Sequence, residues 1–141
     1  MAAASRSIVI NAPVEKVFDT ITAYETYPQF LTECKEVKTS NRQGNQVDVH
    51  YKIDLVKSLR YTLRMREERP GKLTWSFVEG EIMKDNQGTW VLEADGEGKT
   101  KATYTIEVKL PMLVPKAIVS TLVDAGLPKM LEAFKKRAEM A

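Results

Sequence analysis

The chain has 141 residues and a net charge of +2, and 43% of its residues are hydrophobic and 28% charged. This length suits a single domain, residues 1–141, and the apolar fraction is sufficient for a core, so we do not expect a disordered chain. The small net charge argues against DNA binding, because nucleic-acid-binding domains usually carry a larger and clustered basic excess.

The cysteine count and hydropathy exclude further classes. The single cysteine, Cys34, cannot form a disulfide within the chain, and a thiolate zinc site needs more than one cysteine. No apolar run is long enough to span a membrane, and the opening residues MAAASRS lack the apolar core of a signal peptide. We therefore expect a cytoplasmic protein.

The first elements in chain order are a short strand and two short helical segments. Residues 7–10 read as a strand that ends at Asn11-Ala12-Pro13. Apolar residues from Val14 to Ile21 recur at helical spacing, which predicts an amphipathic helix over 13–24. The aromatic and proline-containing segment 27–31 is expected to form a second helical turn or a compact loop.

A series of alternating strands follows. The sequence predicts strands at 37–40, 46–56, 59–67, 73–77, 89–94 and 102–110, separated by segments that contain glycine, proline or asparagine. Apolar side chains occupy every second position in these strands. One face of the sheet should therefore be buried and the other exposed to water.

The pattern changes to a helical period after Pro111. Apolar residues recur on one stripe over 115–139, and three basic residues end that segment. Pro128 lies inside the predicted helix and should kink it near Gly126-Leu127. The predicted fold class is α+β, with a curved antiparallel sheet of about seven strands around a long C-terminal helix and two short helices after the first strand.

Four segments of the chain resemble START-like helix-grip (SRPBCC) domains, and most closely the polyketide cyclase/dehydrase and coenzyme Q-binding branch. The resemblance is carried by INAPVEKVFDTITAYETYPQFL, VDVHYKIDLVKSLRYTLRMREERPGKLTWSFVEG, GTWVLEADGEGKTKATYTIEVKLP and AIVSTLVDAGLPKMLEAFKKRAEM. It implies an apolar cavity between the sheet and the C-terminal helix, with the two short helices closing one end of the sheet. Tyr27, Phe30 and Pro128 would then gate the cavity.

The resemblance also makes the inward-facing positions candidates for the wall of a ligand cavity, whereas their pattern alone is typical of a filled core. Apolar walls with a few phenol and indole groups suit a planar or polyprenyl ligand. The predicted ligand-binding residues are Tyr51, Ile53, Tyr61, Leu63, Met65, Trp75, Phe77, Trp90, Leu92, Tyr104, Ile106, Val119, Leu122 and Met130, with Phe134 also facing inward.

Few residues in the sequence could catalyse a reaction. The only histidine, His50, is predicted on the outer face of the sheet, and no metal-ligand spacing or phosphate-binding loop is present, so we expect neither a metal nor a cofactor. The weak catalytic candidates are the inward-facing Tyr51, Tyr61 and Tyr104, with Glu67 at a strand end as a possible base. An enzyme is therefore permitted but not favoured.

Three functions follow from these observations. The leading hypothesis is a carrier or sequestering protein for a hydrophobic small molecule such as a lipid, an isoprenoid quinone or a polyketide-like compound. The second is an aromatase/cyclase that shapes a polyketide chain. The third is a module of the ribosome-association toxin type, which would contact a ribosome, a protein or a membrane transiently through Arg60, Arg64 and Arg66. The sequence indicates no particular oligomeric state.

Overall fold

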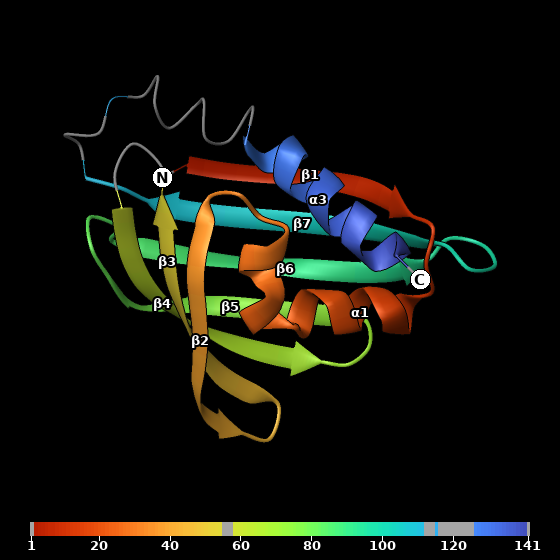
Figure 1. Ribbon diagram of the computed structural model, residues 1–141, viewed down its shortest axis with the longest axis horizontal. Helices are drawn as coiled ribbons and strands as arrows, with labels where there is room; N and C mark the ends of the chain where they lie inside the picture. The colour runs from red at the N-terminus through yellow and green to blue at the C-terminus, as the bar shows by residue number, and fades with distance from the viewer. Residues whose placement is uncertain (1, 55–57, 112–114, 116–125, 141) are drawn as a thin grey trace.

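A computed structural model describes residues 2–54, 58–111, 115 and 126–140 (Figure 1). The chain begins with strand β1 (Ala2–Ile10), followed by helix α1 (Val14–Thr22) and the 3-10 helix η1 (Tyr24–Gln29). Six further strands come next, and helix α3 (Leu127–Glu139) lies near the end of the chain. The six strands are β2 (Cys34–Gln43), β3 (Gln46–Asp54), β4 (Ser58–Glu68), β5 (Lys72–Gly80), β6 (Asp85–Ala94) and β7 (Thr100–Lys109).

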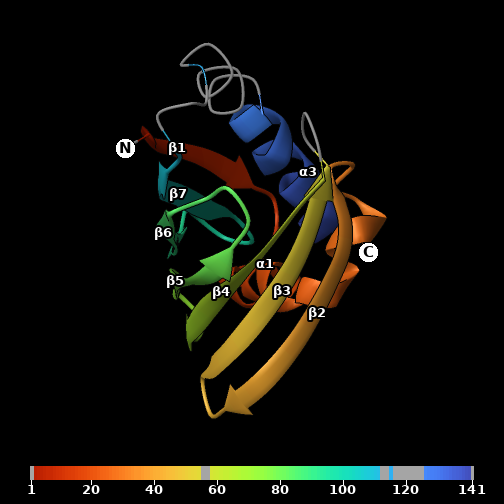
Figure 2. The same ribbon diagram turned by 90° about the vertical axis from the view of Figure 1, so that its left-hand side faces the viewer.

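All seven strands form one antiparallel sheet in the order β1-β7-β6-β5-β4-β3-β2. The sheet curls from β1 to β2, and α1, η1 and α3 lie on its concave side (Figure 2). Helix α3 contacts β1 and α1, whereas η1 contacts β2. The predicted α+β class and the helix-grip arrangement are therefore confirmed.

Strands β1 and β2 are longer than the sequence predicted. Strand β1 begins at Ala2 and pairs with β7 from Ala2↔Val108 onward, although only its last four residues look like a strand in the sequence. Alanine and serine are poor strand formers, so pairing with β7 rather than local propensity sets the length of β1. Strand β2 likewise extends beyond the predicted 37–40, from Cys34 to Gln43.

The predicted start of the strand 89–94 was wrong, because Asn86, Gln87 and Gly88 before it also lie within β6. Gly88 is required there by packing against the neighbouring strands. A Cβ atom on Gly88 would lie 2.3 Å from the carbonyl oxygen of Thr105 and 2.5 Å from the ring of Trp75. The glycine therefore lets a tryptophan ring lie directly over the backbone of β6.

The described part of the C-terminal helix begins at Leu127, with Pro128 in its first turn. The N–H groups of a first turn have no intrahelical acceptor, so proline costs little there. Residues 116–125 of the predicted helix, which include Val119 and Leu122, lie outside the described residues, and the predicted kink stays a prediction. Within the described residues, no helix combines the length and apolar character needed to cross a membrane.

Candidate ligand-binding site

The concave face of the sheet is closed at one end and only partly covered at the other. At the closed end, Ile10, Leu73 and Ala102 are fully buried. Toward the other end several apolar side chains on the same face are only half-buried. We call this set, Ala4, Ile53, Tyr61, Phe77 and Ile106, the open half of the sheet.

Strands β5 and β6 separate within the open half. They pair only over Lys72–Trp75 and Gly88–Val91, after which β5 stays with β4 while the start of β6 pairs with β7. The Trp75 Nε1–H group donates a 3.0 Å hydrogen bond to the Oδ1 atom of Asn86, and both residues are buried. This bond connects the two strands where their backbone ladder stops.

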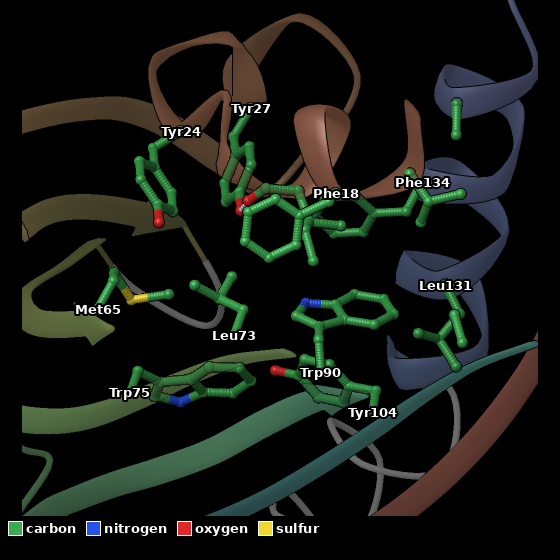
Figure 3. Packing of buried hydrophobic residues seen from close by; sticks show 14 of the residues in the cluster. Phe18, Tyr24, Tyr27, Met65, Leu73, Trp75, Trp90, Tyr104, Leu131 and Phe134 are labelled. Carbon is green, nitrogen blue, oxygen red and sulfur yellow. Dashed lines mark hydrogen bonds between the residues drawn. The ribbon is translucent and has the colours of Figure 1, made fainter. Parts of the chain in front are cut away.

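An aromatic cluster fills the space between the sheet and α3 next to the open half (Figure 3). The ring of Trp90 lies 4.9 Å from that of Tyr104 and 5.4 Å from that of Phe134, measured between centroids. Trp75 lies 5.3 Å from Tyr104. Because these rings contact one another edge to face or at a tilt, they form a packed aromatic layer beside the open half.

The predicted ligand-binding residues thus divide into two groups. Leu63, Met65, Trp75, Trp90 and Leu92 are buried in the core together with Tyr51 and Tyr104. Ile53, Tyr61, Phe77, Ile106 and Met130 are half-buried. The buried residues of the first group can hold the second group in position. The half-buried residues of the second group have exposed side-chain surface that could contact a ligand.

The phenols of this region stay protonated at neutral pH. Tyr51 and Tyr61 are cross-strand partners whose rings stack at 5.0 Å between centroids and 17° between planes. Burial, reinforced by the neighbouring phenols, raises the pKa of Tyr51 well above its ordinary value, and burial also raises the pKa values of Tyr61 and Tyr104. These hydroxyl groups can donate hydrogen bonds to a carbonyl but are poorly suited to act as bases.

The structure does not bring Glu67 together with the open half. Glu67 lies six residues from Tyr61 along β4, a separation of about 20 Å in an extended strand. The Tyr24 hydroxyl donates to its Oε2 atom at 2.7 Å, and two Arg42 nitrogens donate at 2.8 and 3.1 Å. Burial opposes ionisation of Glu67, but these donors outweigh it and lower the pKa of the carboxyl group.

The predicted gate residues occupy three different settings. Tyr27 is buried, its hydroxyl donates to the carbonyl oxygen of Ile21, and its ring lies 5.3 Å from that of Phe134. Phe30 is half-buried beneath the Arg137 guanidinium, and Pro128 is exposed. Tyr27 therefore packs as a core residue, and the proposed gating by these residues stays a prediction.

The outer face of the sheet carries the predicted arginines and the only histidine. His50 lies on this face as predicted, with its ring nitrogens 2.6 Å from the Ser40 hydroxyl and 2.8 Å from the Thr62 hydroxyl. Arg64 is not a free cation, because it forms a bidentate ion pair at 2.9 and 3.2 Å with Asp48. Sequence alternation placed Asp48 on this face but gave no signal that it would be buried.

No described set of histidine, cysteine, aspartate and glutamate side chains is clustered closely enough to hold a metal ion. The buried Cys34 thiol has a pKa of about 11, raised by burial and by the adjacent Glu33 carboxylate. A thiol with so high a pKa is mostly protonated at neutral pH, so it is a poor nucleophile.

The curved antiparallel sheet, the C-terminal helix and the partly covered concave face between them define the helix-grip fold. The chain belongs to the family described as "Polyketide cyclase / dehydrase and lipid transport", whose family model matches residues 1–139. No curated protein matched the sequence.

Solved structures with the same fold cover almost the whole chain. TTHA0849 from Thermus thermophilus is similar with a TM-score of 0.87 at 19% identity, covering 97% of both chains. The Zhui aromatase/cyclase from Streptomyces sp. R1128 has a TM-score of 0.88 at 13% identity, covering 98% of this chain and 93% of its own. A START superfamily protein from Mycobacterium smegmatis has a TM-score of 0.86 at 17% identity, covering 97% of both chains.

Proposed function

We propose that this protein binds a hydrophobic small molecule between the open half of the sheet and α3, and acts as a carrier or sequestering protein. The observation that carries the proposal is the uneven burial of the concave face. Phe77 and Ile106 keep exposed surface on the same face where Leu73 and Ala102 have none. Covering that surface with an apolar ligand contributes roughly 25 cal/mol per Å² before the entropic costs of binding.

The chemistry of the open half favours an apolar ligand with one carbonyl-bearing end. Ile53, Phe77 and Ile106 offer only apolar contacts, whereas Tyr61 adds a phenol that stays protonated. Such a wall suits a lipid, an isoprenoid quinone or a polyketide-like compound. The family description, which includes lipid transport, supports the same ligand class.

A pair of substitutions on β7 tests where the ligand binds. Ile106 faces the open half and its neighbour Thr105 faces the outer side of the sheet. We expect Ile106→Phe to weaken binding of decylubiquinone about tenfold, because overpacking a fitted site costs about 1–3 kcal/mol. Quenching of tryptophan fluorescence by the quinone measures this affinity, since Trp75 and Trp90 belong to the aromatic cluster next to the proposed site.

Thr105→Phe is the matched control, because it adds the same ring on the opposite face. Its affinity for decylubiquinone should equal that of the wild type. Equal losses in both variants would contradict the location of the site. If neither decylubiquinone nor oleate binds the wild-type protein, the proposed function is wrong.

An aromatase/cyclase remains the second candidate, supported by the similarity of the fold to the Zhui aromatase/cyclase. A cyclase can act chiefly by holding a flexible chain in a reactive shape, with Tyr51, Tyr61 and Tyr104 orienting carbonyl groups. Glu67 is a poor choice of base because Arg42 and Tyr24 already bind its carboxylate. Tyr61→Phe should change the product profile of a polyketide substrate if this candidate is correct.

The third candidate, contact with a ribosome or membrane through the outer arginines, loses part of its basis. Arg64 is neutralised by Asp48, which leaves Arg60 and Arg66 as the exposed cations of that predicted row. Charge reversal at Arg60 and Arg66 should abolish co-sedimentation with ribosomes if this candidate is correct.

A further inference from the structure

A second concavity lies on the outer face of the sheet, on the side opposite the proposed ligand site. It is a groove of about 500 Å³ over β2, β3, β4 and the end of β5. This volume is within the usual range for small-molecule sites. The groove is lined by, among others, His50, Lys52, Arg60, Thr62, Glu79 and Glu81.

An irregularity in the pairing of β4 and β5 builds one wall of the groove. Leu63 pairs with Phe77 but Thr62 pairs with Glu79, so Val78 is an extra residue in β5. Such a bulge changes the face toward which the following side chains point. Glu79 therefore stands opposite Thr62, which belongs to the outer face, although simple alternation from Phe77 would direct it inward.

The chain beyond β5 continues along β4 and adds a second carboxylate to this wall. The backbone N–H of Arg60 donates to the Oε1 atom of Glu81 at 2.8 Å. The backbone N–H of Glu81 donates to the carbonyl oxygen of Arg60 at 2.9 Å. Glu81 is thus fixed by two hydrogen bonds at the edge of the groove.

The middle of the groove is cationic, between Glu36 on β2 and Glu81 beyond β5. Lys52 and Arg60 are direct cross-strand partners in β3 and β4. Like charges in that arrangement repel each other unless an anion lies between them. The Glu36 carboxylate lies near both, but its ion pair, at 2.9 Å, is with Lys38.

The Lys52 and Arg60 side chains do not pair with the carboxylates of Glu79 and Glu81. Across the described parts of the chain, no ion pair within 4.0 Å joins Lys52 or Arg60 to Glu79 or Glu81. A groove in which these cations and carboxylates lie near one another without pairing matches a ligand that carries both charges.

We propose that this outer groove is a second binding site, which takes a small zwitterion. Its oxyanion would bind Lys52 and Arg60, and its ammonium group would bind Glu79 and Glu81. Charge-assisted hydrogen bonds of this kind are among the stronger polar contacts in proteins. The proposal does not depend on the hydrophobic ligand, because the charged side chains that carry it belong to the outer face, although Tyr51 and Tyr61 line the groove as well.

His50 provides a reporter for the groove. It is the only histidine in the chain, so its ring-proton signals in an NMR spectrum need no assignment among several candidates. Its ring lines the groove between Ser40 and Thr62. A zwitterion bound in the groove should therefore shift these signals in a saturable manner.

The test is an NMR titration of the full chain with O-phosphoethanolamine at constant ionic strength. Inorganic phosphate and ethanolamine, each carrying one of the two charges, serve as separate probes. We expect each to bind at least about tenfold more weakly than phosphoethanolamine, because each forms only part of the charge-assisted contacts. Potassium chloride at equal ionic strength should leave the His50 signals unchanged.

Three variants locate the binding. Lys52→Gln combined with Arg60→Gln should weaken phosphoethanolamine binding at least about tenfold, and so should Glu79→Gln. Arg66→Gln is the matched control, since Arg66 is an exposed arginine on the same face of β4 but does not line the groove. None of these four side chains is buried, so glutamine should be tolerated at each position, and a thermal melt verifies folding.

Two results would overturn the proposal. One is a wild-type protein whose His50 signals do not respond saturably to phosphoethanolamine. The other is an equal loss of binding in Arg66→Gln, which would mean diffuse attraction to the whole face.

Flotation with phosphatidylethanolamine vesicles then distinguishes a lipid headgroup from a soluble zwitterion as the source of the bound group. Vesicle binding that free phosphoethanolamine competes away supports a lipid headgroup, and its absence alongside binding of the free probe supports a soluble zwitterion.

Discussion

The carboxylate of Glu67 connects three elements of the fold. It accepts hydrogen bonds from Tyr24 in η1 and from Arg42 in β2, while its own backbone lies in β4. Its side chain is 15% exposed, so these contacts are largely shielded from solvent. Loss of a partner in such a setting is costly, because the remaining polar groups are left without full compensation.

Replacing this carboxylate should therefore lower stability. We expect Glu67→Gln to reduce the free energy of unfolding by about 1–3 kcal/mol, measured by urea denaturation at pH 7. Glu68→Gln, an exposed neighbour for which the described structure shows no side-chain bond, should have an effect near zero. Similar losses in the two variants would contradict the account of the Glu67 contacts.

The same residue predicts a pH dependence. The pKa of Glu67 is lowered in the folded chain from an ordinary value of 4.5, so the folded state favours its ionised form. The stabilisation is complete above pH 4.5 and is lost as the pH falls through the lowered folded pKa. The stability difference between wild type and Glu67→Gln should shrink across that acidic range. A difference that stays constant there would show that ionisation of Glu67 does not matter.

At the scale of the element, the close approach of β5, β6 and β7 depends on Gly88. The ring of Trp75 occupies the space that any side chain at this position would need. We expect Gly88→Ala to lower the free energy of unfolding by about 1–3 kcal/mol, and to change Trp75 fluorescence as the ring moves. Gly71→Ala is the control, because a Cβ atom there meets only the Leu92 carbonyl oxygen at an ordinary 3.5 Å. A neutral Gly88→Ala would contradict the packing described here.

The elements show which features of the fold could be predicted from the sequence. Strict alternation in β3 and β4 correctly predicted which side chains face inward, because a strand with one buried face must alternate. The length of β1 could not be predicted, because its alanines and serines become a strand only through pairing with β7. Gly88 appeared to precede a strand because the Trp75 ring that requires it comes from another strand.

The sites were predictable to different degrees. The inward-facing residues of the candidate ligand site follow from alternation together with the family resemblance. The division of these residues into a packed aromatic layer and an open half could not be predicted, because it depends on where β5 and β6 separate. The outer groove could not be predicted either, since the bulge at Val78 reverses the face of Glu79 and leaves no local signal in the sequence.

At the scale of the whole molecule, the sheet separates two chemical environments. Its concave face carries a packed aromatic cluster and half-buried apolar side chains. Its outer face carries ion pairs, hydroxyl groups and a charged groove. We therefore propose that a hydrophobic ligand binds on the concave side alone. A hydrophobic ligand held there would lie against the half-buried apolar side chains of the sheet, next to the aromatic cluster that contacts α3.

The most direct test of this central claim is native mass spectrometry of the purified protein, followed by organic extraction and mass analysis of any released compound. The account predicts one apolar molecule per chain, released on extraction and absent or much reduced in Ile106→Phe but retained in Thr105→Phe. A protein that carries no such molecule, and that takes up neither decylubiquinone nor oleate when these are added, would contradict it.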